Sequence, residues 1–405
     1  MANTNNNKSL NVPILRFPEF TGEWRQDLME NVTERIGDGI HSTPTYNEYG
    51  DYFFINGNNL VDGKIKIFNN TQKVTKEEAL KQNANVLCDN SLLLSINGTI
   101  GNVAIYNNER IMLGKSACYI NPSAKILRDF LFFYLQNSKI QKYFILELTG
   151  STIKNLSLTS IKNTKLRLPS IQEQAKIAKL LRAIDERIAT QNKIIEKLQS
   201  LIKGLPHKAA ETGLINGSWE KAPLSTVLVE RKELNAALHT VHSVSVSEGV
   251  INQIDYLGRS FAAKDTSNYH VARKGDIIYT KSPTGDFPFG IVKQSYIDKP
   301  VAISPLYGVY SPISFELGVY LHNYFLSAIS TINYLYPLVQ KGAKNTINIS
   351  NQRFLENRIP LPTNLADIHN LAKALTAIQR KLNIEQRTLA SLSKQKQYLL
   401  QQMFI

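Results

Sequence analysis

The chain has 405 residues, 43% of them hydrophobic and 9% aromatic, so it is long and apolar enough to bury two substantial cores. Its 47 lysine and arginine residues outnumber its 33 acidic residues, which leaves a formal net charge of +14 at pH 7. This balance favours a polyanionic partner, nucleic acid before membrane, and the alternative is a generally basic surface without such a partner. Two cysteines, Cys88 and Cys118, are too few and too far apart for a disulfide framework or a metal knuckle.

We expect no targeting signal in the N-terminal residues. They are rich in asparagine and lack the basic start and apolar run of a signal peptide, and no stretch of the chain approaches membrane-spanning length. We therefore expect residues 1–14 to be a disordered N-terminus and the protein to be cytoplasmic, which also suits its few cysteines.

A first globular region is expected at 15–167. Short apolar runs separated by Asn-Gly and Gly-Asn turns predict several strands and fewer helices. The strands are expected at 52–55, 64–68, 92–96 and 103–106, and the helices at 77–82 and 129–141. The sequence therefore predicts an α+β domain with a curved, mostly β core.

A long amphipathic helix is expected over 170–208, within the segment 168–212. Ser170 and Glu173 have the spacing of a capping box at its start, and Gly204 and Pro206 mark its expected weak end. Its apolar residues step by four and three in alternation, which is the heptad pattern of a coiled-coil seam. The seam comprises Ile177, Leu181, Ile184, Ile188, Ile195 and Leu198.

The same plan recurs about 194 residues later. The pairs Ala178 and Ala372, and Leu198 and Leu392, are separated by this interval, and Trp219 follows Trp24 at almost the same distance. We expect a second β-rich domain at 213–362, with a strand at 274–279 and a helix at 317–327, and then a second long helix at 363–405. Its seam comprises Leu371, Leu375, Ile378, Leu382, Leu389 and Leu392. The chain is therefore a duplicated module of one β-rich domain and one long helix.

The motif search predicts no catalytic or metal site. There is no complete Gly-x-x-x-x-Gly-Lys-Ser/Thr phosphate loop, since Gly114-Lys115-Ser116 lacks the first glycine of that motif. Asp62 and Lys64 have a nuclease-like spacing without the Pro-Asp element that should precede it. His239 and His242 could share one helical face, but no third ligand is near them in the sequence.

The order of domain, helix, domain and helix resembles the specificity subunit of type I restriction-modification systems. The segment Leu168-Pro169-Ser170-Ile171-Gln172-Glu173-Gln174 is similar to the Leu-Pro-x-x-x-Glu-Gln start of that family's long helices, and segments 38–44 and 54–60 are similar to parts of its target recognition domains. The resemblance covers nearly the whole chain. The second copy departs from it, since Asp367 and Ile368 stand where Glu-Gln would be.

The resemblance implies a DNA-binding subunit that is not an enzyme on its own. Target recognition domains 1 (15–167) and 2 (213–362) would each read half of a bipartite double-stranded DNA target. The two helices would pack as an antiparallel coiled coil with a pseudo-two-fold axis, set the spacer between half-sites, and dock two modification (methyltransferase) subunits. Two restriction (translocase and nuclease) subunits would join for cleavage. S-adenosylmethionine, ATP and magnesium would belong to these partners, and this chain would hold no cofactor.

Candidate DNA-contacting residues are polar or basic loop residues, most of them beside glycine or proline, because such side chains are free to reach a groove. The alternative is that they cap turns. The candidates of the first domain are His41, Ser42, Thr43, Tyr46, Asn58, Asn59, Lys64, Thr152, Lys154 and Asn155, and those of the second are Arg259, Lys264, Tyr269, Lys281, Lys341, Lys344 and Asn345.

Each seam contains one polar position near its middle, Gln191 in the first and Glu385 in the second. In an antiparallel pair these residues would lie in adjacent layers, where a hydrogen bond could fix the register at some cost in stability. The alternative is that both side chains point to water.

Two other classes of function are compatible with parts of the sequence. The chain could be the recognition part of a stand-alone restriction and methylation enzyme, although methylation and nuclease motifs are missing from it. It could instead be a non-catalytic coiled-coil scaffold, which explains the helices but not two β-rich domains with basic, varied loops.

Overall fold

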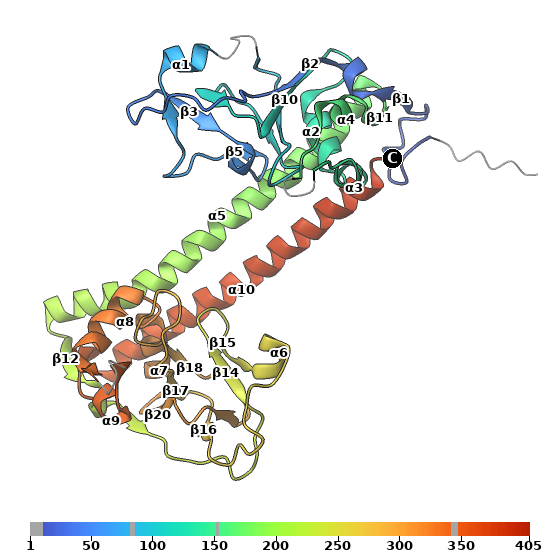
Figure 1. Ribbon diagram of the computed structural model, residues 1–405. Coiled ribbons are helices and arrows are strands. Elements are labelled where there is room, and N and C mark those ends of the chain that lie inside the picture. The colour runs from blue at the N-terminus through green and yellow to red at the C-terminus, as the bar shows by residue number, and fades with distance from the viewer. Residues whose placement is uncertain (1–10, 82–85, 151–153, 342–346) are drawn as a thin grey trace, which may run out of the picture. The chain divides into compact units, whose positions relative to one another are not determined.

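The computed structural model describes residues 11–81, 86–150, 154–341 and 347–405. The chain divides into two compact units: unit 1 comprises residues 1–190 and 389–405, and unit 2 comprises residues 191–388. Two long helices, α5 (Ile171–Asn216) and α10 (Leu365–Gln402), each contribute to both units (Figure 1). The mixture of helices and short strands confirms the predicted α+β class.

Unit 1 is built on an antiparallel sheet with the strand order β2-β10-β7-β8, next to a smaller sheet with the order β6-β3-β9. In the smaller sheet β3 runs antiparallel to β6 and parallel to β9. Two further strand pairs are β1–β11 and β4–β5. The strands are β1 (Arg25–Leu28), β2 (Thr33–Asp38), β3 (Tyr52–Ile55), β4 (Leu60–Val61), β5 (Lys64–Ile65), β6 (Lys73–Val74), β7 (Leu92–Ser95), β8 (Val103–Ile105), β9 (Ile111–Leu113), β10 (Ala117–Pro122) and β11 (Lys165–Leu168).

The main sheet of unit 1 is buried on both faces. Successive side chains of a strand point to opposite sides, so neighbouring residues of one strand lie in different cores. Leu92 and Leu94 of β7 face a core shared with α2 and the start of α5, whereas Leu93 faces a second core shared with β3 and β9. Figure 1 shows α2, α3 and α4 gathered beside the first turns of α5. The helices of unit 1 before α5 are η1 (Met29–Val32), η2 (Gly57–Asn59), α1 (Lys76–Leu80), α2 (Arg128–Gln136), α3 (Ser138–Leu146) and α4 (Leu158–Lys162).

Three expectations for unit 1 need correction. The helix predicted at 129–141 is two helices, because Asn137 adopts an extended backbone and caps α3 by accepting the N–H of Lys139 at 2.7 Å. The strand predicted at 64–68 ends at Ile65, because Lys66 turns away to exchange hydrogen bonds with Asn59. Of the segment 1–14, residues 1–10 lie outside the described residues, and Asn11 is already held by the N–H of Trp24.

The start of α5 explains the Glu-Gln pair in the sequence. Ser170 accepts the N–H of Glu173, but the Glu173 carboxylate does not complete a capping box. Instead it accepts two hydrogen bonds of 2.7 Å from Arg16 and one of 3.2 Å from Trp24 Nε1. The neighbouring Gln174 accepts the N–H of Leu127. Glu173 therefore attaches the N-terminal segment to α5, and Gln174 attaches the residue that precedes α2 to α5.

Unit 2 repeats the frame of unit 1. Its main sheet has the order β13-β20-β17-β18, which corresponds strand for strand to β2-β10-β7-β8, and the pair β12–β23 corresponds to β1–β11. Three more pairs are β14–β15, β16–β19 and β21–β22. The strands are β12 (Trp219–Pro223), β13 (Leu228–Glu230), β14 (His242–Ser245), β15 (Gly249–Asn252), β16 (His270–Ala272), β17 (Ile277–Tyr279), β18 (Val292–Gln294), β19 (Val301–Ile303), β20 (Gly308–Pro312), β21 (Gln340–Lys341), β22 (Ile347–Asn348) and β23 (Arg358–Pro362).

The helices of unit 2 also have counterparts in unit 1. Helices α7 and α8 stand in the chain order where α2 and α3 stood, and α9 stands where α4 stood. Ser157 caps α4 and Ser350 caps α9, and each follows a buried apolar residue, Leu156 or Ile349. The helices of unit 2 before α10 are η3 (Leu224–Thr226), α6 (Gln253–Leu257), α7 (Phe315–Tyr324), α8 (Ala328–Leu335), η4 (Tyr336–Leu338) and α9 (Asn351–Phe354).

Helix α5 continues to Asn216, beyond the end predicted at residue 208. Pro206 lies inside it, and it ends where Gly217 takes a φ of 75°, the left-handed conformation typical of a helix C-terminus. Pro206 is buried, so packing offsets the hydrogen bond that a proline removes. Asn364 caps the start of α10 by accepting the N–H of Ala366.

Both seams face inward as predicted. Ile177 and Leu181 of α5 belong to the same core as Leu400 of α10 in unit 1, and Asp185 pairs with Lys396 at 2.7 Å. Because rising residue numbers in α5 meet falling numbers in α10, the helices pack antiparallel there. In unit 2, Leu371 and Leu375 of α10 join the main core.

The polar seam positions meet directly within unit 2. Gln191 is 8% exposed, and its Nε2 donates to the Glu385 backbone oxygen at 3.1 Å and also to the Glu385 carboxylate. Lys381 donates to the other carboxylate oxygen at 2.7 Å. These hydrogen bonds from Lys381 and Gln191 lower the pKa of Glu385. The hydrogen bond predicted between the two seams is therefore confirmed.

Candidate nucleic-acid interface

Four loops of unit 1 converge at one edge of its main sheet. Hydrogen bonds tie them together: Ile96 N–H donates to Ser116 O at 3.0 Å, and Leu156 N–H donates to Ile96 O at 2.9 Å. Thr99 Oγ1 donates to Gly57 O at 3.2 Å. We call these loops the loop rim; it comprises residues 56–59, 97–101, 114–116, 149–150 and 154–155.

The loop rim has the electrostatic character of a nucleic-acid interface. Its sequence contains no aspartate or glutamate. Lys115 and Lys154 are exposed, and neither forms an ion pair within the described residues. Unpaired lysines on a polar edge can neutralise phosphates and release counterions, which is the main sequence-independent source of affinity for DNA.

The predicted segment 41–46 borders this rim. Ile40 forms a bridge with Gly114, so the chain that follows passes beside the rim loop at 114–116. His41 Nε2 lies 2.7 Å from Asp38 Oδ2, and the side chain is largely exposed. Ser42 and Thr43 are exposed as well, and the Tyr46 ring packs edge-on against Phe54 at 5.8 Å.

The other candidates of unit 1 lie in different environments. Asn58 and Lys154 are exposed on the loop rim, and Asn155 is partly buried there because it bridges Asn97. Lys64 is exposed on β5, but no hydrogen bond joins it to the rim within the described part of the chain. Thr152 lies outside the described residues.

Asn59 is the candidate that the structure argues against. It is only 4% exposed, its Nδ2 donates to Lys66 O at 2.9 Å, and its Oδ1 accepts the N–H of Asn56 at 3.0 Å. The side chain therefore caps a turn, which was the alternative considered for every candidate.

Candidates of unit 2 fall into two groups. Arg259 lies over the Phe261 ring at 4.5 Å, Lys264 is exposed nearby in sequence, and Tyr269 Oη accepts the N–H of Ala263. Lys281 begins the loop between β17 and β18 with a φ of 60°, and burial lowers its pKa. No hydrogen bond within the described residues joins Lys281 to the first group. Lys344 and Asn345 lie outside the described residues, and of Lys341 only the backbone, in β21, is described.

Two residues of the loop rim are not among the candidates predicted from the sequence. Thr99 and Lys115 lie in tight turns that the sequence marks only by glycine, Asn97-Gly98 before one and Gly114 before the other. The glycine spacing identified the turns, but nothing in it showed that turns far apart in sequence meet at one edge.

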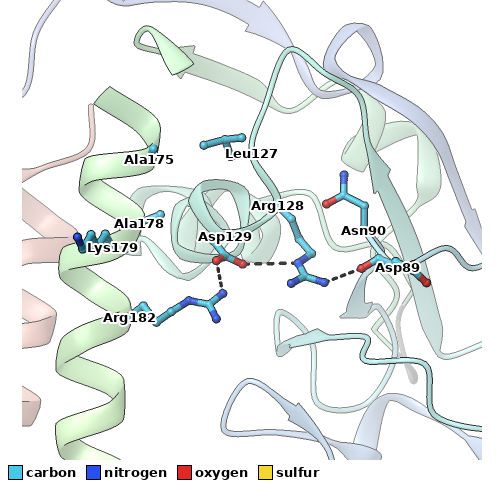
Figure 2. Close-up of a pocket in the computed structure, with 9 residues that line it drawn as sticks. All are labelled: Asp89, Asn90, Leu127, Arg128, Asp129, Ala175, Ala178, Lys179 and Arg182. Atoms are coloured by element: carbon cyan, nitrogen blue, oxygen red, sulfur yellow. Dashed lines mark hydrogen bonds and ion pairs between the residues drawn. The ribbon is translucent and has the colours of Figure 1, made fainter. Parts of the chain in front are cut away.

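An open cavity of about 550 Å³ in unit 1 is a less suitable anion site. It lies between the start of α2 and the start of α5, as Figure 2 shows. Arg182 is paired with Asp129, and Arg128 lies 3.5 Å from Asp129 and donates to Asp89 O at 2.6 Å. Its arginines are therefore already engaged, unlike the lysines of the loop rim.

Within the described residues there is no cluster of three histidine, cysteine or acidic side chains that could hold a metal ion. No helix in the described part of the chain is long and apolar enough to cross a membrane.

Known proteins share this sequence pattern. Residues 31–200 match the family described as the type I restriction modification DNA specificity domain. The MjaVIII specificity subunit of Methanocaldococcus jannaschii, a type I restriction enzyme subunit, is 25% identical over 386 residues, which cover 87% of this chain and 84% of that protein. The EcoBI specificity subunit of Escherichia coli is 26% identical over 39% of this chain and 34% of its own length.

The fold is shared as well. A crystal structure of a type I restriction-modification S subunit from M. genitalium matches with a TM-score of 0.61 at 15% identity, covering 97% of this chain and 99% of that one. The two chains therefore share a fold over nearly their whole lengths. Over most of its length the chain is thus similar in sequence to a type I restriction enzyme specificity subunit, and residues 31–200 match the specificity domain of that family.

Proposed function

We propose that this chain recognises duplex DNA for a type I restriction-modification complex, with unit 1 and unit 2 each reading one half of a bipartite target. The loop rim is the observation that carries the proposal, because it gathers exposed polar side chains and the unpaired Lys115 and Lys154 at one edge without a carboxylate. The repeated frame with different loops supports two half-sites of different sequence.

The long helices supply the second part of the proposal. Their seams bury one another, and charged side chains such as Arg187 and Lys193 point outward from α5. We propose that α5 and α10 set the spacer between half-sites and dock two modification subunits, and that two restriction subunits join for cleavage. Catalysis, and with it S-adenosylmethionine, ATP and magnesium, would belong to those partners.

The test is to purify the full chain with and without its modification subunits and to map methylated positions on duplex DNA. The proposal expects one bipartite motif with a fixed unread spacer, methylated only when the partner is present. Binding by the chain should weaken steeply with salt, because each phosphate contact contributes close to one unit to the slope of log K against log salt.

The same experiment separates the alternatives. Methylation or cleavage by the chain alone would favour a stand-alone enzyme and overturn the non-catalytic assignment. A scaffold would bind the partner subunits but show no preference between target and non-target duplexes. A continuous motif without a spacer would contradict the division of reading between the two units.

A further inference from the structure

We infer that Asn58 is the side chain with which unit 1 reads an adenine edge in the major groove. The inference rests on the proposed function and goes beyond it, since it names one base-reading residue and the base class it selects. Asn58 lies at the tip of η2 on the loop rim, where it is exposed.

The backbone that carries Asn58 is fixed from several sides. Gly57 N–H donates to Ser116 Oγ at 2.9 Å, Gly57 O accepts from Thr99, and Asn56 and Asn59 form a reciprocal capping box across the turn. A Cβ on residue 57 would lie 2.8 Å from Ser95 Oγ and 3.0 Å from Ser116 O, so the close approach of these loops requires glycine. The tip is therefore held in place before any ligand binds, which lowers the entropic cost of recognition.

The polar side chains next to Asn58 form hydrogen bonds within the protein, whereas the Asn58 side chain forms none within the described residues. Ser116 Oγ donates to Asn56 Oδ1 at 2.8 Å, and the Asn59 amide is consumed by Lys66 and Thr71. The Asn58 carboxamide forms no hydrogen bond within the described residues. An asparagine whose donor and acceptor are both free, on a rigid and exposed tip, is equipped to bind an external partner.

The chemistry of that partner follows from the carboxamide. It presents one donor and one acceptor side by side, which matches the N7 acceptor and N6 donor of adenine in the major groove. The exposed Lys115 and Lys154 on the same rim provide cations for the flanking phosphates. His41 is a poorer candidate for this role because its ring is already paired with Asp38.

The test compares Asn58→Ala with a matched control, Asn70→Ala, in the complete complex with its modification subunits. Asn70 is another exposed asparagine of unit 1 whose side chain forms no hydrogen bond within the described residues. Sequencing of methylated sites should show that Asn58→Ala relaxes one A·T position of one half-site by roughly tenfold to a hundredfold, while the other half-site and the spacer stay unchanged. Asn70→Ala should leave both half-sites intact.

Two further measurements separate reading from folding and from phosphate binding. The melting temperature of Asn58→Ala should equal that of the wild type, because its side chain has no partner to lose. Lys115→Ala should weaken binding to all sequences alike and reduce the salt slope by about one unit.

The outcomes distinguish this inference from the proposed function. If the wild-type complex yields no bipartite motif, both fail. If the wild type yields the motif and Asn58→Ala leaves every position as specific as before, only the role of Asn58 is wrong. If the relaxed position is a G·C pair, the assignment to adenine is overturned.

Discussion

Units 1 and 2 have the same frame and differ in what is attached to it. The main sheets have the same strand order, and Trp24 and Trp219 are both buried at the first strand pair. The segments inserted into this frame differ, however. Unit 1 has β3 to β6 and α1 between β2 and β7, whereas unit 2 has the hairpin β14–β15, α6 and β16 between β13 and β17. Burial constrains the frame, whereas the exposed loops of the insertions are free to diverge toward different ligands.

The difference reaches into the frame at two buried positions. Glu173 of unit 1 corresponds by the 194-residue interval to Asp367 of unit 2, yet the first is buried in an ion pair and the second is exposed. In the sheet, the partner of Leu93 is Ala104, and the partner of the corresponding Ile278 is Lys293. One copy therefore needs a buried carboxylate and the other a buried amine where its counterpart has neither.

Among the substitutions that test this difference between the units, Glu173→Ala should cause the largest loss of stability. The side chain of Glu173 is 1% exposed and that of Arg16 is 14% exposed, so the substitution leaves a poorly solvated guanidinium without a partner. We expect unit 1 to lose about 3–5 kcal/mol of unfolding free energy, and Asp367→Ala to cost less than about 1 kcal/mol.

The two tryptophans allow each unit to be followed by itself. Trp24 lies in unit 1 and Trp219 in unit 2, so denaturant titrations in a Trp219→Phe background report on unit 1 alone. Equal losses for Glu173→Ala and Asp367→Ala, each measured in its own unit, would show that the two helix starts are anchored alike.

The second prediction concerns pH and Lys293. Burial lowers the pKa of Lys293 to about 8, and its ammonium donates to Val246 O at 2.7 Å. Since the unfolded chain binds this proton more tightly, unit 2 should gain stability as pH rises above 8, by about 1–2 kcal/mol up to pH 9.5. Above pH 10 this gain should be offset, because burial raises the pKa of Tyr310 and Tyr320, so that the folded form disfavours their ionisation.

Lys293→Met is the matched variant for this measurement. In a Trp24→Phe background, its stability should rise less between pH 8 and 9.5 than that of the parent, because burial also lowers the pKa of Lys281, a lysine of unit 2 that this variant retains. A parent whose stability falls or stays constant over this window would contradict the assignment to Lys293.

The sequence predicted the features of the fold that repeat at a regular interval, and it did not predict the features that depend on single residues. The four-three steps predicted both long helices and their inward seams, and the 194-residue interval predicted the duplication. The sequence did not show that Asn137 breaks a helix, that Pro206 lies within one, or that Asn59 is buried. Two of these depend on side-chain contacts that no periodic pattern predicts: Asn137 donates to Leu400 O, far away in the sequence, and Asn59 is held by Lys66 and Thr71. Pro206 is tolerated within α5 because it is buried.

A smaller effect is expected at the seam, where both copies contribute to one contact. Replacing the hydrogen-bonded pair by Gln191→Leu with Glu385→Leu should raise the melting temperature by about 2–4 °C, because a partly buried polar pair gives way to apolar packing. The same change should loosen the register of the helices and broaden the spacing of the half-sites. A double variant with a single spacing and a lower melting temperature would show that the pair does not fix the register.

The most direct test of the central claim, that two reading units are separated by a helical spacer, is to lengthen α5. Four residues inserted between Glu186 and Gln199 add about 6 Å and nearly complete a helical turn, so the seam stays roughly inward, whereas two residues would turn it outward and should impair folding. Each added base pair also rotates the second half-site by about 35°, so one added pair is the expected change. Sequencing of methylated sites should therefore show a spacer longer by one base pair with both half-sites unchanged. An unchanged spacer, or altered bases in either half-site, would contradict the account.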